Sequence, residues 1–144
     1  MNKIVYEADF YGWANEQAAL LRDGRLNEAD IENIAEEIES MGRSEKRELV
    51  SRLTVLLTHL LKWRFQPVGR GSSWRTSIVV QRRALDRHLT DNPSLKPRIL
   101  EAVDSAYRDA ILIAGDETKL GESVFPQECP WTFEDIANPD FWPT

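Results

Sequence analysis

One apolar stripe constrains the fold more than any other feature of this sequence. Between Ser44 and Arg64, apolar residues recur at the three- and four-residue spacing of an α-helix. The stripe consists of Leu49, Leu53, Leu56, Leu60 and Trp63, with Val50, Leu57 and Leu61 beside it. A stripe this wide must contact at least two neighbours to be buried. We therefore expect a long central helix over 44–64, capped by Ser44.

Similar patterns predict the other helices. Their expected ranges are about 10–22, 27–41, 73–90 and 94–118. Gly24 and Gly42 are expected to end the first two of these helices. A capping box at 132–135 predicts a short last helix.

The predicted fold class is all-α, because no segment has the alternation of a strand. We expect a single-domain helical bundle over 1–144, with four to five main helices plus a short C-terminal helix. In the helix over 27–41, the apolar stripe is formed by Ile31, Ile34, Ile38 and Met41. The acidic side chains Glu32, Glu36 and Glu39 lie off this stripe and are expected to face solvent.

The composition is that of a folded protein in a reducing compartment. The chain has 144 residues, of which 42% are hydrophobic and 29% charged. Its net charge of -6 argues against nucleic-acid binding by the whole surface. The single cysteine, Cys129, has no partner for an internal disulfide. No signal peptide or membrane span is recognisable, so we expect a cytoplasmic protein without membrane association.

The helix over 73–90 has polar side chains beside its apolar face. That face consists of Trp74, Ile78, Leu85 and Leu89. At about 100° per residue, Arg82 and Gln81 lie on its two borders. A buried unpaired charge is unfavourable, so Arg82 either extends to water or has an anionic partner. By the same angular argument, Glu37 is the acidic residue that we expect to pair with Arg82.

A polar pocket between the helices over 27–41, 44–64 and 73–90 is one interpretation of these residues. The candidate pocket consists of Glu37, His59, Trp74, Gln81 and Arg82. Arg82 and Gln81 would hold an anionic or carbonyl group, and His59 would transfer a proton. The simpler alternative is that His59 is a boundary residue and that Arg82 makes a structural contact.

Metal-binding motifs are missing from the sequence. The chain has no cysteine pair and lacks the Glu-x-x-His spacing of di-iron bundles. A site built on His59, His88 and Glu37 is a weaker alternative. We therefore expect neither a metal nor another cofactor.

A basic segment with interleaved aromatic residues extends from Lys62 to Arg87. The candidate basic binding surface consists of Lys62, Arg64, Arg70, Arg75, Arg83 and Arg87. Such a pattern is typical of single-strand nucleic-acid binding. It is equally suited to the protein's own acidic helix or to an acidic protein partner. Nucleic acid is the less favoured partner, because a helix spreads these cations around its circumference.

Several stretches resemble one known family. They are "DFYGWANEQAALLRDGR", "IAEEIESMGRSEKREL", "LLTHLLKWRFQP", "SSWRTSIVVQRR" and "FPQECPWTFEDI". Over about 9–143, the chain resembles the bacterial family called domain of unknown function twenty-nine. This resemblance implies an all-α bundle, and it supplies no activity, cofactor or catalytic residue.

Two functions are consistent with these observations. The favoured one is a small cytoplasmic helical protein that binds another protein through the basic-aromatic segment or the acidic helix. The alternative is an enzyme or small-anion-binding protein that uses the polar pocket, with action on nucleic acid as a variant. The sequence does not define the oligomeric state.

Overall fold

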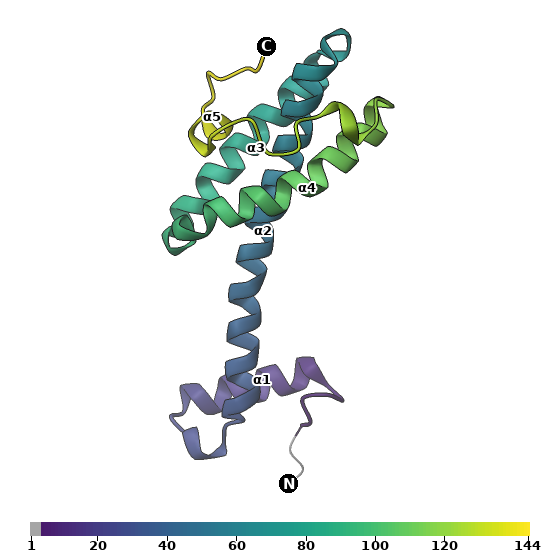
Figure 1. The fold of residues 1–144 in the computed structure, drawn as a ribbon. Helices are drawn as coiled ribbons and strands as arrows, with labels where there is room; N and C mark the ends of the chain where they lie inside the picture. Colours follow the sequence, from purple (N-terminus) through teal and green to yellow (C-terminus); the bar gives the residue numbers. More distant parts are fainter. Residues whose placement is uncertain (1–3) are drawn as a thin grey trace. The chain divides into compact units, whose positions relative to one another are not determined.

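The computed structural model describes residues 4–144, which contain helices and no strand. The helices are α1 (Phe10–Arg22), α2 (Ile31–Phe65), α3 (Ser72–Asp91), α4 (Ile99–Thr118) and α5 (Phe133–Ala137) (Figure 1). Short 3-10 turns lie in the connections, and the longest of them, Pro93–Arg98, leads into α4. This arrangement confirms the all-α class, with four main helices of the four to five expected and a short C-terminal helix.

Helix ends agree with the capping signals in several places. The side chain of Asp9 accepts a hydrogen bond from the Gly12 backbone N–H at 3.0 Å, which caps α1. Gly24 follows the end of α1 with φ of 71°, a conformation that glycine adopts without strain. Thr132 caps α5 by accepting from the Asp135 N–H at 3.2 Å. The predicted boundaries of α1, α3 and α5 are therefore correct to within two residues.

Helix α2 corrects one prediction. The expected helices over 27–41 and 44–64 are a single helix that runs through Gly42, so Ser44 is not a cap. A glycine inside a helix costs about 1 kcal/mol relative to alanine, but it does not force the helix to end. The helix begins at Ile31 rather than Asn27, because Asp30 accepts from the backbone N–H and the side-chain amide of Asn33.

The chain comprises two compact units. The N-terminal unit is Met1–Ser44 and the C-terminal unit is Glu45–Thr144, so the boundary falls within α2. The expectation of a single domain stays a prediction, because the division does not show whether either unit folds alone. No helix in the described part of the chain is long and apolar enough to cross a membrane.

The C-terminal unit has a dense aliphatic core. Six leucines of α2 are fully buried, namely Leu49, Leu53, Leu56, Leu57, Leu60 and Leu61. Ile78 and Leu85 of α3 and a row of alanines on α4 belong to the same cluster. The small side chains let α4 approach its neighbours closely, and at Gly115 a Cβ would lie 2.8 Å from the Glu122 backbone nitrogen. The leucine stripe therefore occupies the centre of this unit, as its width predicts.

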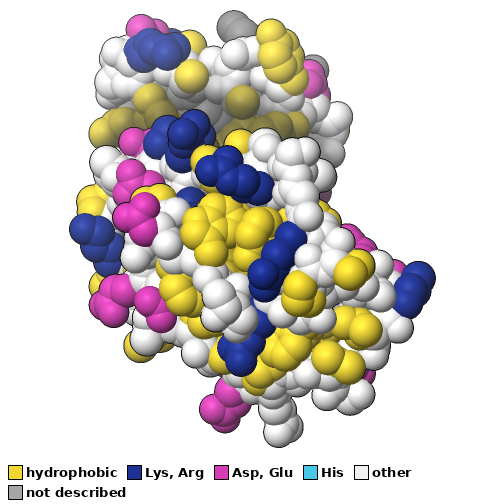
Figure 2. Space-filling view, turned by 90° about the horizontal axis from the view of Figure 1, so that it is seen from above, with side chains coloured by type: hydrophobic (Ala, Val, Ile, Leu, Met, Phe, Trp, Pro, Cys, Tyr) yellow, Lys and Arg dark blue, Asp and Glu magenta, His cyan; other side chains and the backbone are white. Residues whose placement is uncertain are grey.

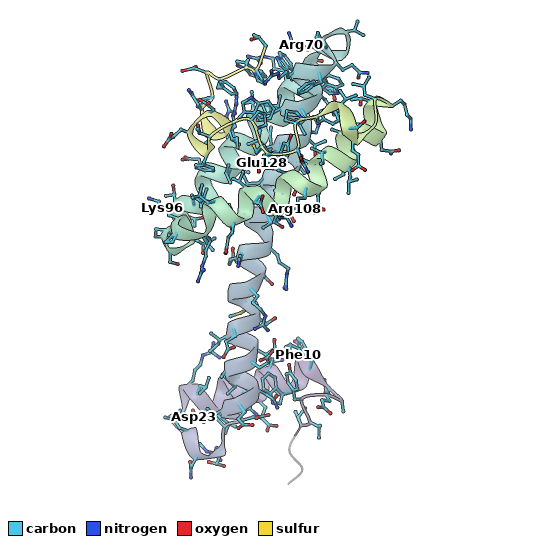
Figure 3. All side chains as sticks on the ribbon, viewed as in Figure 1. Phe10, Asp23, Arg70, Lys96, Arg108 and Glu128 are labelled. Atoms are coloured by element: carbon cyan, nitrogen blue, oxygen red, sulfur yellow. The ribbon has the colours of Figure 1, made fainter. Side chains whose placement is uncertain are left out.

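The N-terminal unit is held together differently. Trp13 and Gln17 are its only buried residues within 4–44. The rings of Tyr6 and Phe10 pack against Trp13, with centroids 4.6 Å and 5.6 Å from it, and the labelled Phe10 in Figure 3 marks this cluster. The Trp13 indole donates to Asp30 at 3.0 Å, and the Asp30 backbone N–H donates to the Gln17 side chain at 2.6 Å. Three rings and a few polar bonds thus join α1 to the start of α2.

Candidate protein-binding surface

Arg82, which the sequence puts on a border of the apolar face of its helix, is buried, and its partners are not carboxylates. Its guanidinium donates to three backbone carbonyls of the C-terminal segment: Ile136 at 2.8 Å, Phe141 at 2.7 Å and Asp135 at 3.4 Å. It also lies 5.5 Å from the ring centroid of Trp142. Burial lowers the pKa of Arg82, yet a guanidinium remains charged in proteins. Carbonyl dipoles and the ring therefore compensate the buried charge.

The predicted ion pair between Glu37 and Arg82 is wrong. Glu37 belongs to the N-terminal unit and accepts a hydrogen bond from the Tyr6 hydroxyl. This bond raises the pKa of Tyr6. The physical reason for the error is that a carbonyl-rich turn near the C-terminus satisfies Arg82, and backbone carbonyls have no signature in the sequence.

The remaining residues of the candidate pocket do not converge. The His59 ring donates from Nδ1 to the Val55 carbonyl at 2.8 Å, one turn earlier on α2. Trp74 packs over Gly69 and lies 5.1 Å from the Lys62 ammonium group. Gln81 and Arg82 line different cavities, of about 250 and 380 Å³. Within the described residues, His59, His88 and Glu37 do not form a group of close potential ligands, and His88 faces Glu45 and Glu48 instead.

Several cations of the candidate basic surface serve contacts within the chain. Lys62 is buried and its ammonium lies 3.0 Å from the Glu117 carboxylate. Arg70 donates to the Trp63 carbonyl at 2.6 Å and packs on the Trp63 ring. The exposed members of the set are Arg64, Arg75, Arg83 and Arg87. Figure 2 shows Lys and Arg side chains bordering hydrophobic ones on one face. The interleaved Trp63 and Trp74 already have cationic partners within the chain, Arg70 and Lys62.

An exposed apolar line runs along the first part of α2. Ile31, Ile38 and Met41 are 54%, 59% and 63% exposed, although their spacing puts them on one face of the helix. The N-terminal unit has eight of the sixteen exposed large hydrophobic residues in the described chain, although it is less than half as long as the C-terminal unit. Apolar side chains that gather on a surface mark sites of protein interaction.

Acidic side chains border this apolar line. Glu32, Glu36 and Glu39 are exposed, as expected. The N-terminal unit has ten acidic and four basic residues, and the C-terminal unit has fourteen of each. The whole net charge of -6 therefore lies in the N-terminal unit. Its ion pairs of Arg43 with Glu36 and Glu39 are exposed, and Arg43 is already counted in this net charge.

The sequence indicates the stripe of α2 but not its exposure. The other aliphatic side chains of the unit, such as Val5, Leu21 and Leu26, are themselves exposed and do not cover the stripe. Tyr6, which holds Glu37, was also missed, because an isolated tyrosine before a helix has no characteristic spacing.

A comparison with known families gives one match. The family model described as "Domain of unknown function DUF29" matches residues 5–142, nearly the whole chain. This match confirms the resemblance that the sequence motifs indicate. The comparisons with curated proteins and with solved structures found no match.

Proposed function

We propose that this chain, which belongs to the family of Domain of unknown function DUF29, acts by binding a protein partner through its N-terminal unit. The family description names no activity, so the proposal rests on geometry. The observation that carries it is the exposed line of Ile31, Ile38 and Met41 within a unit of net charge -6. We call this line with its acidic border the α2 face.

The α2 face suits a partner of defined chemistry. Burying an Ile or Met side chain contributes about 1.5–3 kcal/mol, so three of them supply a useful apolar anchor. Exposed carboxylates beside the anchor attract cations and accelerate encounter. The partner is therefore an amphipathic segment, such as a helix, with an apolar stripe and Lys or Arg on its flanks. A second copy of the chain is disfavoured, because it would bring two acidic units together.

We place this interaction in the cytoplasm of a bacterium. The single cysteine supports a reducing compartment, and Cys129 is half-buried with its pKa raised by burial. The family resemblance supports the bacterial source. Neither point bears on the identity of the partner.

The alternative function, a small-anion-binding protein or enzyme, has one supporting observation. Arg82 lines the cavity of about 380 Å³ with Arg83 and Asp86, and its Nη1 atom has no hydrogen-bond partner within residues 4–144. Because Nε and Nη2 already bind carbonyls, we favour protein binding. Titration with inorganic phosphate tests the alternative: saturable binding that is lost in Arg83→Leu would support it.

A labelled model peptide tests the binding proposal directly. The probe is a synthetic helix of leucine and lysine in an amphipathic pattern, and its leucine-glutamate counterpart is the charge control. Fluorescence anisotropy should show saturable binding of the lysine peptide, weaker at high salt, and no binding of the glutamate peptide. The triple variant Ile31→Ser/Ile38→Ser/Met41→Ser should bind about tenfold more weakly or worse.

A matched variant controls for nonspecific binding of the peptide to exposed apolar side chains. Val68→Ser/Leu100→Ser/Leu112→Ser removes three exposed apolar side chains from the C-terminal unit and should bind like the unchanged protein. Equal binding by both triple variants would overturn the proposal. So would a dimer, seen by sedimentation, that only the α2-face variant disrupts, because the occupant would then be a second copy.

A further inference from the structure

A buried histidine in the C-terminal unit faces two carboxylates. His88 lies in the last turn of α3 and is 6% exposed. Its Nε2 atom lies 2.8 Å from the Glu45 carbonyl oxygen, which can only accept, so Nε2 carries a hydrogen. Its Nδ1 atom lies 3.0 Å from a Glu48 carboxylate oxygen and 3.6 Å from one of Glu45.

The position of the hydrogen on the His88 ring indicates what its other nitrogen can bind. A neutral imidazole has one N–H, and here the Glu45 carbonyl fixes it on Nε2. The Nδ1 lone pair would then face two acceptors, an arrangement that a bound cation relieves.

We propose that Glu45, Glu48 and His88 bind a divalent transition-metal ion through Nδ1 and one oxygen of each carboxylate. The three ligand atoms lie within 4.8 Å of one another. Metal bonds of about 2.0–2.2 Å at tetrahedral angles put neighbouring ligand atoms about 3.3–3.5 Å apart. The two distances from Nδ1, 3.0 and 3.6 Å, lie close to this range, and the two carboxylates, whose ligand oxygens lie within 4.8 Å of each other, would close on the ion by side-chain rotation.

The surroundings fit a metal site in two further respects. Metal-binding histidines usually donate their second N–H to a carbonyl or carboxylate, as His88 does to Glu45. A cavity of about 250 Å³ adjoins Glu48 and is lined also by Gln81, whose buried Oε1 atom has no hydrogen-bond partner in the described chain. Three protein ligands and a neighbouring cavity leave a fourth position for a small ligand.

The ligand set favours Zn²⁺, Mn²⁺ or Fe²⁺, because these ions bind imidazole nitrogen well. Ca²⁺ and Mg²⁺ are disfavoured, because they prefer sites made of oxygen ligands alone. Arg52 is the competing cation, since its Nε lies 3.2 Å from the same Glu48 oxygen as Nδ1. The Arg52 side chain is partly exposed, so it can stay hydrogen-bonded to the Glu48 carboxylate while that carboxylate binds the metal. Lys46 pairs with Glu101 instead.

Metal titration of the tag-free protein in a Cys129→Ser background tests the site. Calorimetry should show one equivalent of Zn²⁺ bound, and Co²⁺ should give a visible absorption band that Zn²⁺ abolishes. Glu48→Gln should weaken Zn²⁺ binding by about tenfold or more. Removing a residue that only hydrogen-bonds to a metal ligand already lowers metal affinity by about tenfold, and removing a ligand itself lowers it at least as much. Zn²⁺ should raise the melting temperature of the parent protein and not that of Glu48→Gln.

The second histidine supplies the matched control. His59→Gln alters a half-buried ring on α2 outside the cluster and should bind Zn²⁺ like the parent. If His88→Gln does not fold, Glu45→Gln and Glu48→Gln carry the test, because both side chains are partly exposed. Absence of saturable binding, or equal binding by Glu48→Gln and His59→Gln, would overturn the proposal.

Discussion

The two parts of α2 have the same kind of apolar stripe and opposite surroundings. In the N-terminal unit, Ile38 and Met41 are more than half exposed, whereas in the C-terminal unit Leu57 and Leu60 are fully buried. The difference lies in what surrounds the helix. In the C-terminal unit α3, α4 and α5 contribute to one core, while within the described residues 4–44 the elements beside α2 are α1, the segment before it and the short turn Leu26–Glu28. Helical periodicity thus shows which face is apolar and does not show whether that face is covered.

The two units also differ in net charge. The C-terminal unit is neutral overall and directs cations inward, as with Arg82 on its carbonyls and Lys62 on Glu117. The N-terminal unit has all the excess negative charge on a surface that also exposes aliphatic side chains. A neutral unit with a closed core is suited to be a scaffold, and an acidic unit with an open face is suited to bind.

The largest expected difference between the units is in how much the free energy of unfolding falls when an aliphatic side chain is truncated. Leu57→Ala should lower the free energy of unfolding by about 2–5 kcal/mol, because it leaves a cavity in the core. Ile38→Ala should lower it by about 0.5 kcal/mol or less, because its side chain is exposed. Urea denaturation measures both. Similar costs for the two variants would contradict the distinction between the units.

Arg82 is expected to have the next largest effect. Arg82→Leu should lower the free energy of unfolding by about 2–3 kcal/mol, because it removes charge-assisted bonds to three carbonyls and leaves those carbonyls unpaired. The segment after Asp135 should also become sensitive to protease. Arg83→Leu, which alters an exposed neighbour, is the control. An unchanged melting temperature in Arg82→Leu would show that the guanidinium does not hold this segment.

The smallest expected changes in the free energy of unfolding come from replacing one glycine in each unit by alanine. Gly42→Ala should raise the free energy of unfolding by about 0.5–1 kcal/mol, because Gly42 is helical and a Cβ there meets nothing within 4 Å. Gly115→Ala should lower it by about 1–3 kcal/mol, because its Cβ would press on the Glu122 backbone. Thermal and urea unfolding give the signs. Destabilisation by Gly42→Ala would indicate that α2 is interrupted there.

Much of the fold was predictable, because local chemistry determines it. The cap at Thr132 and the leucine stripe depend on near neighbours in the chain, and the structure confirms both predictions. Gly42 was misjudged, because a glycine signals a helix end only where the backbone adopts a left-handed turn. A weak helix former is tolerated when the residues on both sides remain helical.

The contacts between distant residues were not predictable. The partners of Arg82 are carbonyls more than fifty positions away, and every residue has a carbonyl. His88 meets Glu45 and Glu48 only because α3 packs against α2, so no sequence spacing reveals the cluster. The border position of Arg82 followed from the helical spacing, whereas its burial and its partners required the fold.

Thiol labelling at one exposed and one buried position of α2 tests the central claim most directly. In the Cys129→Ser background, the labelling rates of Ile38→Cys and Leu57→Cys are compared under native conditions. The account predicts that Ile38→Cys reacts as fast as in the urea-unfolded protein, whereas Leu57→Cys is strongly protected. Strong protection at both positions would mean that the α2 face is already covered in the free protein, and the open binding surface would not exist.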